Sequence, residues 1–334
     1  MANMIKDLLE PSSLPDITKE VRLIQTHISM VLVADNFVYK IKKPVDFGFL
    51  DFTDLEKRKF YCHQEVKLNS RLAEDIYLGV LPVIFDGKVH RIGMNHTGGE
   101  IVDYAVKMRR IPQDRLMKSL FQRGELTEEH LRKISLKLST FHLNAERSPE
   151  IDHFGEPDAF RINTEENFEQ TEKYIDITIK EKDYRHLSRW TDLFLKNKES
   201  LFRERISMQK IRDCHGDLHM EHVCLTDKVS VIDCIEFNDR FRYSDTIADI
   251  AFLLMDLEFH GGKEVADRLW SLYAEETGDS EMMELLTFYK VYRAYVRGKV
   301  NSFRLDDPNI PEGEKTRAIR EASRYFELAR SYVD

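Results

Sequence analysis

The strongest constraint on the fold of this chain is a pair of aspartates, Asp217 and Asp233, set among short apolar runs. Asp217 lies in the loop sequence HGDLHMEH, the β-rich run HVCLT follows, and Asp233 comes directly after the run VSVI. Phosphoryl transfer needs two such carboxylates, because one accepts the proton of a hydroxyl and the other holds the metal that neutralises the phosphates. The pair therefore favours a transfer site over two isolated turn residues.

The overall composition excludes several other classes of protein. The chain has 334 residues, enough for two lobes, and its formal charge of −9 argues against the basic face that nucleic-acid binding needs. The N-terminus has no basic-then-apolar signal pattern, and the longest apolar stretch, IADIAFLLMDL, is about half a membrane span. We expect a cytoplasmic protein that binds neither nucleic acid nor a membrane; the oligomeric state stays open.

The order of the expected elements predicts an α+β fold with two lobes. The first third contains short β-rich runs such as SMVLVAD and FVYKIKK, followed by a helix over about 54–72. From about residue 109 the pattern is mostly helical, with a β-hairpin near residue 230. We predict a small antiparallel-sheet lobe with one helix over 1–108 and a larger helical lobe over 109–334, which holds the catalytic loop and the metal-binding hairpin.

The segment from 214 to 254 resembles a known signature. HGDLH, then IDC, then SDTIADIAFLL resemble the motifs of the aminoglycoside phosphotransferase and choline kinase superfamily, which has a protein-kinase-like fold. The stretches VYKIKKPVDFGFLDFTDLEKR and CIEFND are similar to a bacterial branch of it, in which some members carry an additional P-loop ATPase domain. No GxxxxGK[ST] occurs in this sequence, so we expect no such domain here.

The resemblance implies both an activity and a set of roles. It implies transfer of the γ-phosphate of ATP, with Mg²⁺, to a hydroxyl of a small molecule, and it does not select the acceptor. In the superfamily the Asp of HGD is the catalytic base, which falls on Asp217, and the later metal-binding Asp falls on Asp233. The Asp of the following helix, here Asp249, and His215 support the catalytic loop.

The helix expected over 54–72 carries a carboxylate on an apolar stripe. Tyr61, Glu65, Leu68 and Leu72 recur on one face of that helix. A carboxylate among apolar residues is costly unless it is paired. A kinase-like fold supplies the partner, a lysine on the third strand that also contacts the ATP phosphates.

Two lysines compete for that role. In the run FVYKIK the alternation of a strand puts Val38, Lys40 and Lys42 on one side. We favour Lys40, because Val38 can then cover the adenine, whereas choosing Lys42 would place the Lys40 charge against the adenine. Met108 would contact the adenine from the linker between the lobes. The Ser29 hydroxyl would replace a glycine-rich loop at the phosphates, since no GxGxxG is present.

The metal site departs from the family pattern. His222 stands where the superfamily has a second metal-binding Asn, and imidazole is a poor ligand for Mg²⁺ but a better one for Mn²⁺. Glu236, three residues after Asp233, offers a further carboxylate, although a plain strand-end role fits it as well. We predict a metal site of Asp233, His222 and Glu236 for Mg²⁺ or Mn²⁺.

Two other functions stay open at this stage. A non-catalytic or weakly active nucleotide-binding regulator would explain the change at His222. A zinc-dependent hydrolase would use the cluster of His215, His219 and His222, although this cluster lies in a glycine-containing loop rather than on one helix face.

The helix expected over 281–304 bears on the acceptor. It places Arg293, Arg297 and Arg304 on one face. If that face lines the acceptor site it favours an anionic or neutral acceptor over a polycation. The alternative is that these arginines pair with the acidic residues between 165 and 169.

Overall fold

The computed structural model describes residues 2–93, 99–308 and 310–334. Contacts group the chain into two compact units, one of residues 1–124 and 221–239 and the other of residues 125–220 and 240–334. The predicted division at 108/109 stays a prediction. The observed units differ from the predicted lobes in part because the hairpin near residue 230 packs with helix α2 (Leu55–Ala73), so it belongs to the first unit.

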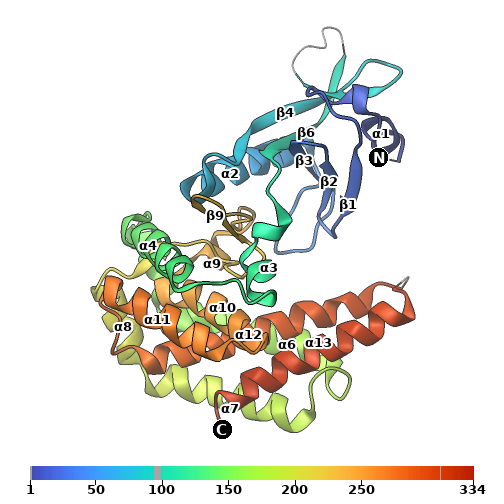
Figure 1. Cartoon of the computed structure of the whole chain (residues 1–334). Helices are drawn as coiled ribbons and strands as arrows, with labels where there is room; N and C mark the ends of the chain where they lie inside the picture. The colour runs from blue at the N-terminus through green and yellow to red at the C-terminus, as the bar shows by residue number, and fades with distance from the viewer. Residues whose placement is uncertain (1, 94–98, 309) are drawn as a thin grey trace. The chain divides into compact units, whose positions relative to one another are not determined.

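The first unit is built on a six-stranded antiparallel sheet with the order β1-β2-β3-β6-β4-β5 (Figure 1). The strands of this sheet are β1 (Arg22–Gln25), β2 (Ser29–Val33), β3 (Phe37–Lys42), β4 (Tyr77–Phe85), β5 (His90–Ile92) and β6 (Glu100–Arg109). The unit also contains α1 (Ala2–Leu8), α2, α3 (Met117–Gln122) and the hairpin of β8 (Val223–Leu225) and β9 (Val229–Val231).

The two faces of this sheet differ in what covers them. One face buries side chains such as Leu32, Tyr39 and Ile41 in a core that includes residues of α1. On the other face, α2 packs against β4 and β6, where Cys62 joins a core with Val106. Strands β2 and β3 carry partly exposed apolar residues on that second face, and the antiparallel register continues them to β6.

Helix α2 begins and packs as its sequence predicts. Asp54 caps it by accepting a hydrogen bond from the Lys57 amide at 2.7 Å. Its buried face contains Glu65, Leu68 and Leu72, so the carboxylate lies inside the apolar stripe. The fold therefore carries Glu65 into the interior beside the sheet.

The second unit is helical. Its helices are α4 (Glu128–Asn144), α5 (Pro149–Asp152), α6 (Pro157–Thr171), α7 (Glu181–Asn197), α8 (Glu199–Ser207), α10 (Thr246–Phe259), α11 (Lys263–Thr277), α12 (Met283–Phe303) and α13 (Glu312–Ser331). Strands β7 (Ile211–Asp213) and β10 (Tyr243–Asp245) pair in this unit, and α9 (Asp239–Arg242) begins at the last residue of the first unit.

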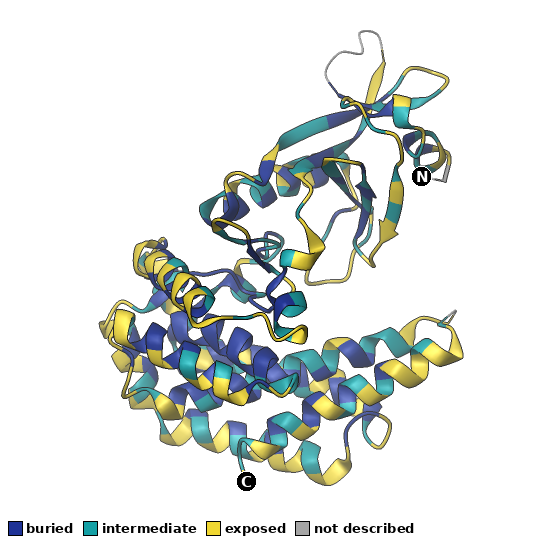
Figure 2. Cartoon of the chain, in the orientation of Figure 1, coloured by how far each residue is buried: buried dark blue, intermediate teal, exposed yellow. Residues whose placement is uncertain are grey.

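Helix α10 is the centre of the second unit. All of its residues from Thr246 to Leu257 are buried, and it packs against α11 and α12 (Figure 2). A helix that is buried on every side does not show a narrow apolar stripe. Asp249 and Asp256 therefore lie inside the unit and need polar partners there.

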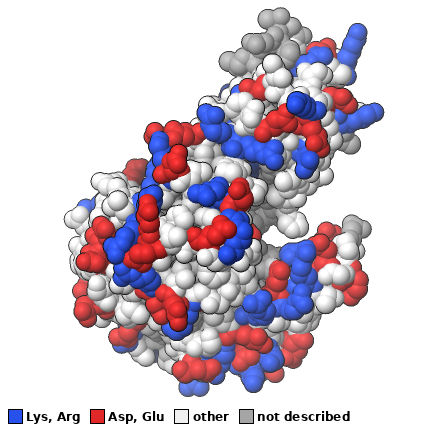
Figure 3. All heavy atoms as spheres, in the orientation of Figure 1, with Lys and Arg blue, Asp and Glu red and all other residues white. Residues whose placement is uncertain are grey.

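The surface carries charges of both signs. On the face shown in Figure 3, basic and acidic side chains lie interspersed. Across the residues that the structure describes, no helix has the length and apolar character needed to traverse a membrane.

Candidate active site

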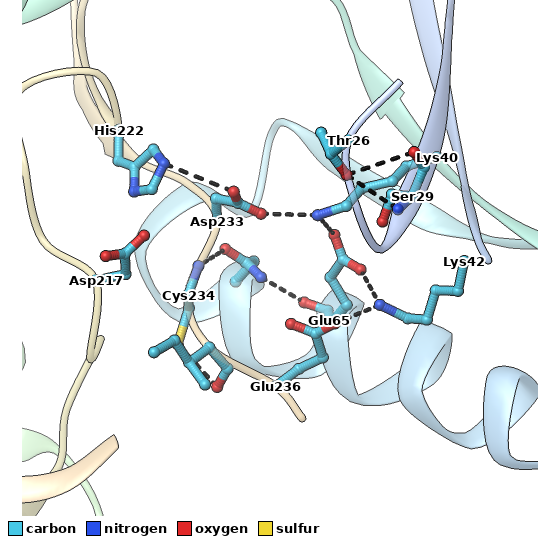
Figure 4. A network of polar contacts seen from close by, with 12 residues as sticks. Thr26, Ser29, Lys40, Lys42, Glu65, Asp217, His222, Asp233, Cys234 and Glu236 are labelled. Carbon is cyan, nitrogen blue, oxygen red and sulfur yellow. Dashed lines mark hydrogen bonds and ion pairs between the residues drawn. The ribbon is translucent and has the colours of Figure 1, made fainter. Parts of the chain in front are cut away.

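Glu65 bridges two lysines in the first unit. Its Oε1 lies 2.8 Å from Lys40 Nζ and its Oε2 lies 2.7 Å from Lys42 Nζ. Lys40 Nζ also lies 2.7 Å from Asp233 Oδ1, and Lys42 Nζ contacts Glu236 Oε1 (Figure 4). The five side chains form one chain of ion pairs that runs from Asp233 to Glu236.

The electrostatics of this network follow from its burial. Burial alone would raise the pKa of Glu65, but the charges of Lys40 and Lys42 hold it below its usual value. Burial raises the pKa of Glu236 in spite of Lys42. Burial would lower the pKa of Lys40, yet Asp233 and Glu65 keep it well above the usual value. Burial would also lower the pKa of Lys42, but the Glu236 and Glu65 carboxylates raise it, so both lysines are cations at neutral pH.

Asp233 has a special backbone conformation. Its φ of 63° lies in the left-handed region, which asparagine and aspartate tolerate better than most residues. Its amide donates to the Tyr77 hydroxyl at 3.1 Å, and the next amide, of Cys234, donates to Asn69 Oδ1 at 2.9 Å. Such backbone outliers cluster at functional sites, so the conformation supports a functional role for this carboxylate.

The predicted metal ligands occupy different surroundings. His222 Nε2 lies 3.6 Å from Asp233 Oδ2, and the Asp233 side chain is 46% exposed. Glu236 is buried against Lys42 instead. Asp233 and His222 therefore lie close to one another, whereas Glu236 would first have to release Lys42 to hold an ion.

The predicted nucleotide contacts share one face of the sheet. The register aligns Val33 with Val38 and Val38 with Met108, and all three side chains are partly exposed. Lys40 lies on the same face, two residues along β3 from Val38. The Ser29 hydroxyl is buried and has no hydrogen-bond partner among the described residues, so it does not stand at an open surface.

In the second unit, Asp249 holds the loop that contains Asp217. Its carboxylate accepts hydrogen bonds from the amide of His215 at 2.9 Å and from that of Gly216 at 2.8 Å. It also contacts His142 Nε2 at 3.1 Å. Burial would raise the pKa of Asp249, but the hydrogen bond with His142 keeps it below its usual range. The loop is thus anchored to α10 by a buried anion.

Two further residues hold this loop, although the sequence analysis did not assign them to it. Arg293 on α12 donates to the carbonyls of Gly216 and Ala248, both at 2.9 Å. Asp256 accepts the amide of Met220 at 3.0 Å. The sequence signal for the role of Asp256 was its spacing from Asp249, two turns apart on the same helix.

The other two arginines of the predicted face behave differently from one another, and Arg304 lies just past the end of α12. Arg304 pairs with Glu314 at 2.8 Å and lies 3.7 Å from Glu321. Arg297 lies over the ring of Tyr325, 5.5 Å from its centroid. The expected acidic partner Glu166 pairs with Arg240 instead, at 2.6 Å. The arginines therefore do not act as one set.

The histidines of the loop have individual contacts. His215 is fully buried, and its Nδ1 accepts the Asp217 amide at 3.3 Å. His219 Nε2 lies 3.6 Å from Asp217 Oδ2, and its ring lies 5.7 Å from that of Phe252. The contact of His215 within the loop matches the loop-supporting role that the resemblance implies, which stays a prediction.

Comparison with known proteins identifies the class of this chain. Residues 63–285 match the phosphotransferase enzyme family, so the chain belongs to that family. It is 34% identical over 310 residues to uncharacterised proteins of Mycobacterium tuberculosis and Mycobacterium bovis, covering 92% of this chain and 59% of each relative. The chain thus spans less than two thirds of the length of these curated relatives.

One solved structure supports the fold directly. A Ralstonia eutropha protein assigned to the aminoglycoside phosphotransferases matches with a TM-score of 0.52 and 12% identity, covering 96% of this chain and 94% of that one. A choline/ethanolamine kinase family protein from Mesorhizobium loti matches with a TM-score of 0.49 and 13% identity, covering 94% and 93%. The predicted α+β, protein-kinase-like architecture, with a sheet lobe and a helical lobe, is confirmed. The zinc hydrolase alternative has no support from these comparisons.

Proposed function

We propose that this chain transfers the γ-phosphate of ATP to a hydroxyl of a small molecule, with Mg²⁺ as the metal. The observation that carries the proposal is the position of Lys40, whose Nζ lies 2.8 Å from Glu65 and 2.7 Å from Asp233. A lysine between a helix carboxylate and a metal-binding aspartate is the arrangement that protein kinases use to hold ATP phosphates.

The nucleotide would bind on the open face of the first unit's sheet. Val33, Val38 and Met108 offer partly exposed apolar surface to the adenine. Lys40, two residues beyond Val38 on the same side, would bind the phosphates. Lys40 is a better candidate than Lys42, because its side chain is 15% exposed and that of Lys42 only 1%.

The metal would be held by Asp233, with His222 as the second donor. The donors fit a divalent cation, because the Asp233 carboxylate is half exposed and His222 Nε2 lies 3.6 Å from it. A bound Mg²⁺ would neutralise charge on the phosphates. Glu236 stays a candidate for the same ion if it exchanges Lys42 for the metal.

Asp217 would act on the acceptor. The acceptor hydroxyl gives its proton to the Asp217 carboxylate while its oxygen forms a bond to the γ-phosphorus. The bond from that phosphorus to the β-phosphate oxygen breaks at the same time, and ADP leaves. The hydrogen bonds of Asp249 to the amides of His215 and Gly216 would keep the base in position.

A nucleotide-binding regulator remains the second candidate, and His222 at the predicted metal site favours it. One experiment separates the two: release of ADP from Mg·ATP, measured with a panel of polyols, amino sugars, amino alcohols and nucleosides. A kinase shows release stimulated by one class, and Asp217→Asn abolishes it. Nucleotide binding without stimulation by any compound, and a basal release that Asp217→Asn leaves unchanged, would favour the regulator.

A further inference from the structure

A second buried ion pair lies beside the one that the proposed function uses. Lys42 Nζ contacts Glu236 Oε1 and lies 2.7 Å from Glu65 Oε2. The side chains of Lys42 and Glu236 are 1% and 5% exposed, whereas that of Asp233, at the opposite end of the network, is 46% exposed. The inner half of the network is therefore closed to solvent and the outer half is open.

The geometry explains how one carboxylate serves two lysines. Lys40 and Lys42 are two residues apart on β3, so they point to the same side with a spacing of about 6.6 Å along the strand. Glu65 places one oxygen against each ammonium group, as Figure 4 shows. Lys42 also lies 4.8 Å from the centroid of the Phe52 ring. Its ammonium group is thus enclosed by two carboxylates and an aromatic ring.

The inner pair connects three separate parts of the first unit. Lys42 belongs to β3, Glu65 to α2, and Glu236 to the segment that begins with Asp233. The same segment is tied to α2 by the Cys234 amide, which donates to Asn69. Contacts of Lys42 therefore fix the helix carboxylate and the segment after the proposed metal ligand relative to one strand.

The charges of the buried groups balance. Lys40, Lys42, Glu65 and Glu236 carry two positive and two negative charges in the network. Without Lys42, Glu65 and Glu236 would face each other with no cation between them, and both would attract Lys40. If Lys40 moved inward it would leave Asp233 and the proposed phosphate position, so the change at Lys42 would weaken nucleotide binding.

We propose that Lys42 and Glu236 are positioning residues that hold Glu65, and through it Lys40, in the orientation needed for nucleotide binding. The inference rests on the proposed nucleotide site of the first unit. It assigns Lys42 no direct contact with ATP. It also gives Glu236 a role that does not require the metal.

The test is a double-mutant cycle on the full chain with Lys42→Met, Glu236→Gln and the double variant. The affinity for a fluorescent ATP analogue with Mg²⁺ and the thermal midpoint are both measured. We expect Lys42→Met to weaken binding by about tenfold or more and to lower the midpoint by an amount on the order of 10 °C. The double variant, which restores charge balance, should bind more tightly than Lys42→Met alone. Lys67→Met, which removes an exposed lysine of α2, the helix that carries Glu65, is the matched control.

The outcomes separate the inference from the proposed function. Suppose that Lys42→Met binds the ATP analogue as tightly as the wild type, under conditions in which both proteins are folded. That result would overturn the positioning role and leave the proposed function standing. Equal affinities of Lys42→Met and the double variant would overturn the charge-balance explanation. If the wild type binds no nucleotide, the proposed function fails and the inference fails with it. Should Lys42→Met not fold, Glu236→Gln against wild type carries the same comparison, because it removes a charge and keeps the shape.

Discussion

Two aspartates in two different units are supported in opposite ways. Around Asp217 the supporting hydrogen bonds act on the backbone: Asp249 accepts the amides of His215 and Gly216, and Arg293 donates to the Gly216 carbonyl. His219 Nε2 lies 3.6 Å from the Asp217 carboxylate, beyond hydrogen-bond distance. Around Asp233 a contact reaches the carboxylate itself, because Lys40 Nζ lies 2.7 Å from Oδ1.

The difference has a physical consequence. Support through the backbone fixes the position of the residue's main chain and does not depend on the charge of its side chain. Support through an ion pair fixes the charge environment, and a ligand must compete with the lysine or share it. Changes to the support of Asp217 should therefore appear mainly as lost stability, and changes around Asp233 mainly as altered ligand affinity.

The largest effect is expected at Asp217. Asp217→Asn should reduce phosphoryl transfer by about two to four orders of magnitude, because the proposed general base is lost. Stability and nucleotide affinity should stay close to wild type, since the supporting hydrogen bonds act on the backbone of the loop and not on the carboxylate. Turnover and thermal unfolding measure the two effects, and Asp227→Asn, in an exposed turn, is the control. Turnover within a few-fold of wild type would remove Asp217 from the mechanism.

The next effect is expected at its support. Asp249→Asn should lower the free energy of unfolding by about 2–4 kcal/mol, since an amide cannot accept both backbone hydrogen bonds and keep His142. The pKa of Asp249 is held below its usual range by the hydrogen bond with His142, despite burial. Its contribution is therefore complete above the unfolded-state pKa of about 4 and declines as the pH falls below it.

Unfolding of both proteins at pH 7 and at pH 3.5 checks this prediction. The stability difference should be large at pH 7 and smaller at pH 3.5. A difference that stays constant, or a variant as stable as wild type with full activity, would show that Asp249 does not anchor the loop through its charge.

The sequence predicted the parts of the molecule that depend on local patterns. The alternation in FVYKIK put Lys40 and Lys42 on one side of a strand, and the stripe of Glu65, Leu68 and Leu72 put the carboxylate inside; the structure has both features. The rivalry between the lysines could not be resolved from these patterns. The structure shows why, since Glu65 contacts both of them.

The rest depends on contacts between residues far apart in the chain. Glu236 pairs with Lys42, 194 residues earlier, and Arg293 reaches a carbonyl 77 residues earlier. No periodicity within one element encodes such pairs. The sequence offered Glu236 as a metal ligand because of its nearness to Asp233, and only the ion pairs of Lys42 with Glu65 and Glu236 show the competing lysine.

A smaller effect is expected at Asp233. Asp233→Ala should remove the part of the nucleotide affinity that depends on Mg²⁺, weakening binding by roughly ten- to a hundredfold. Stability should fall by only about 1–2 kcal/mol, the cost of alanine at a φ of 63°, because the side chain is half exposed and Lys40 keeps Glu65 as a partner. Titration of the fluorescent ATP analogue with Mg²⁺ and with EDTA measures the metal-dependent part. An unchanged affinity in the presence of Mg²⁺ would show that another residue holds the metal.

The smallest effect is expected at His222. His222 Nε2 lies 3.6 Å from Asp233 Oδ2, so the imidazole and the carboxylate face the same space. If both coordinate the ion, the nitrogen donor favours Mn²⁺ over the oxygen-preferring Mg²⁺. His222→Asn replaces that nitrogen with an amide oxygen and should shift the preference toward Mg²⁺ by about threefold to tenfold, measured as the ratio of turnover with the two metals. If His222 only holds its loop, as the hydrogen bond from the Ile232 amide to its carbonyl at 3.0 Å already does through the backbone, the ratio should not move. An unmoved ratio would remove His222 from the proposed metal site and leave Asp233, with Glu236 as the other candidate, to hold the ion.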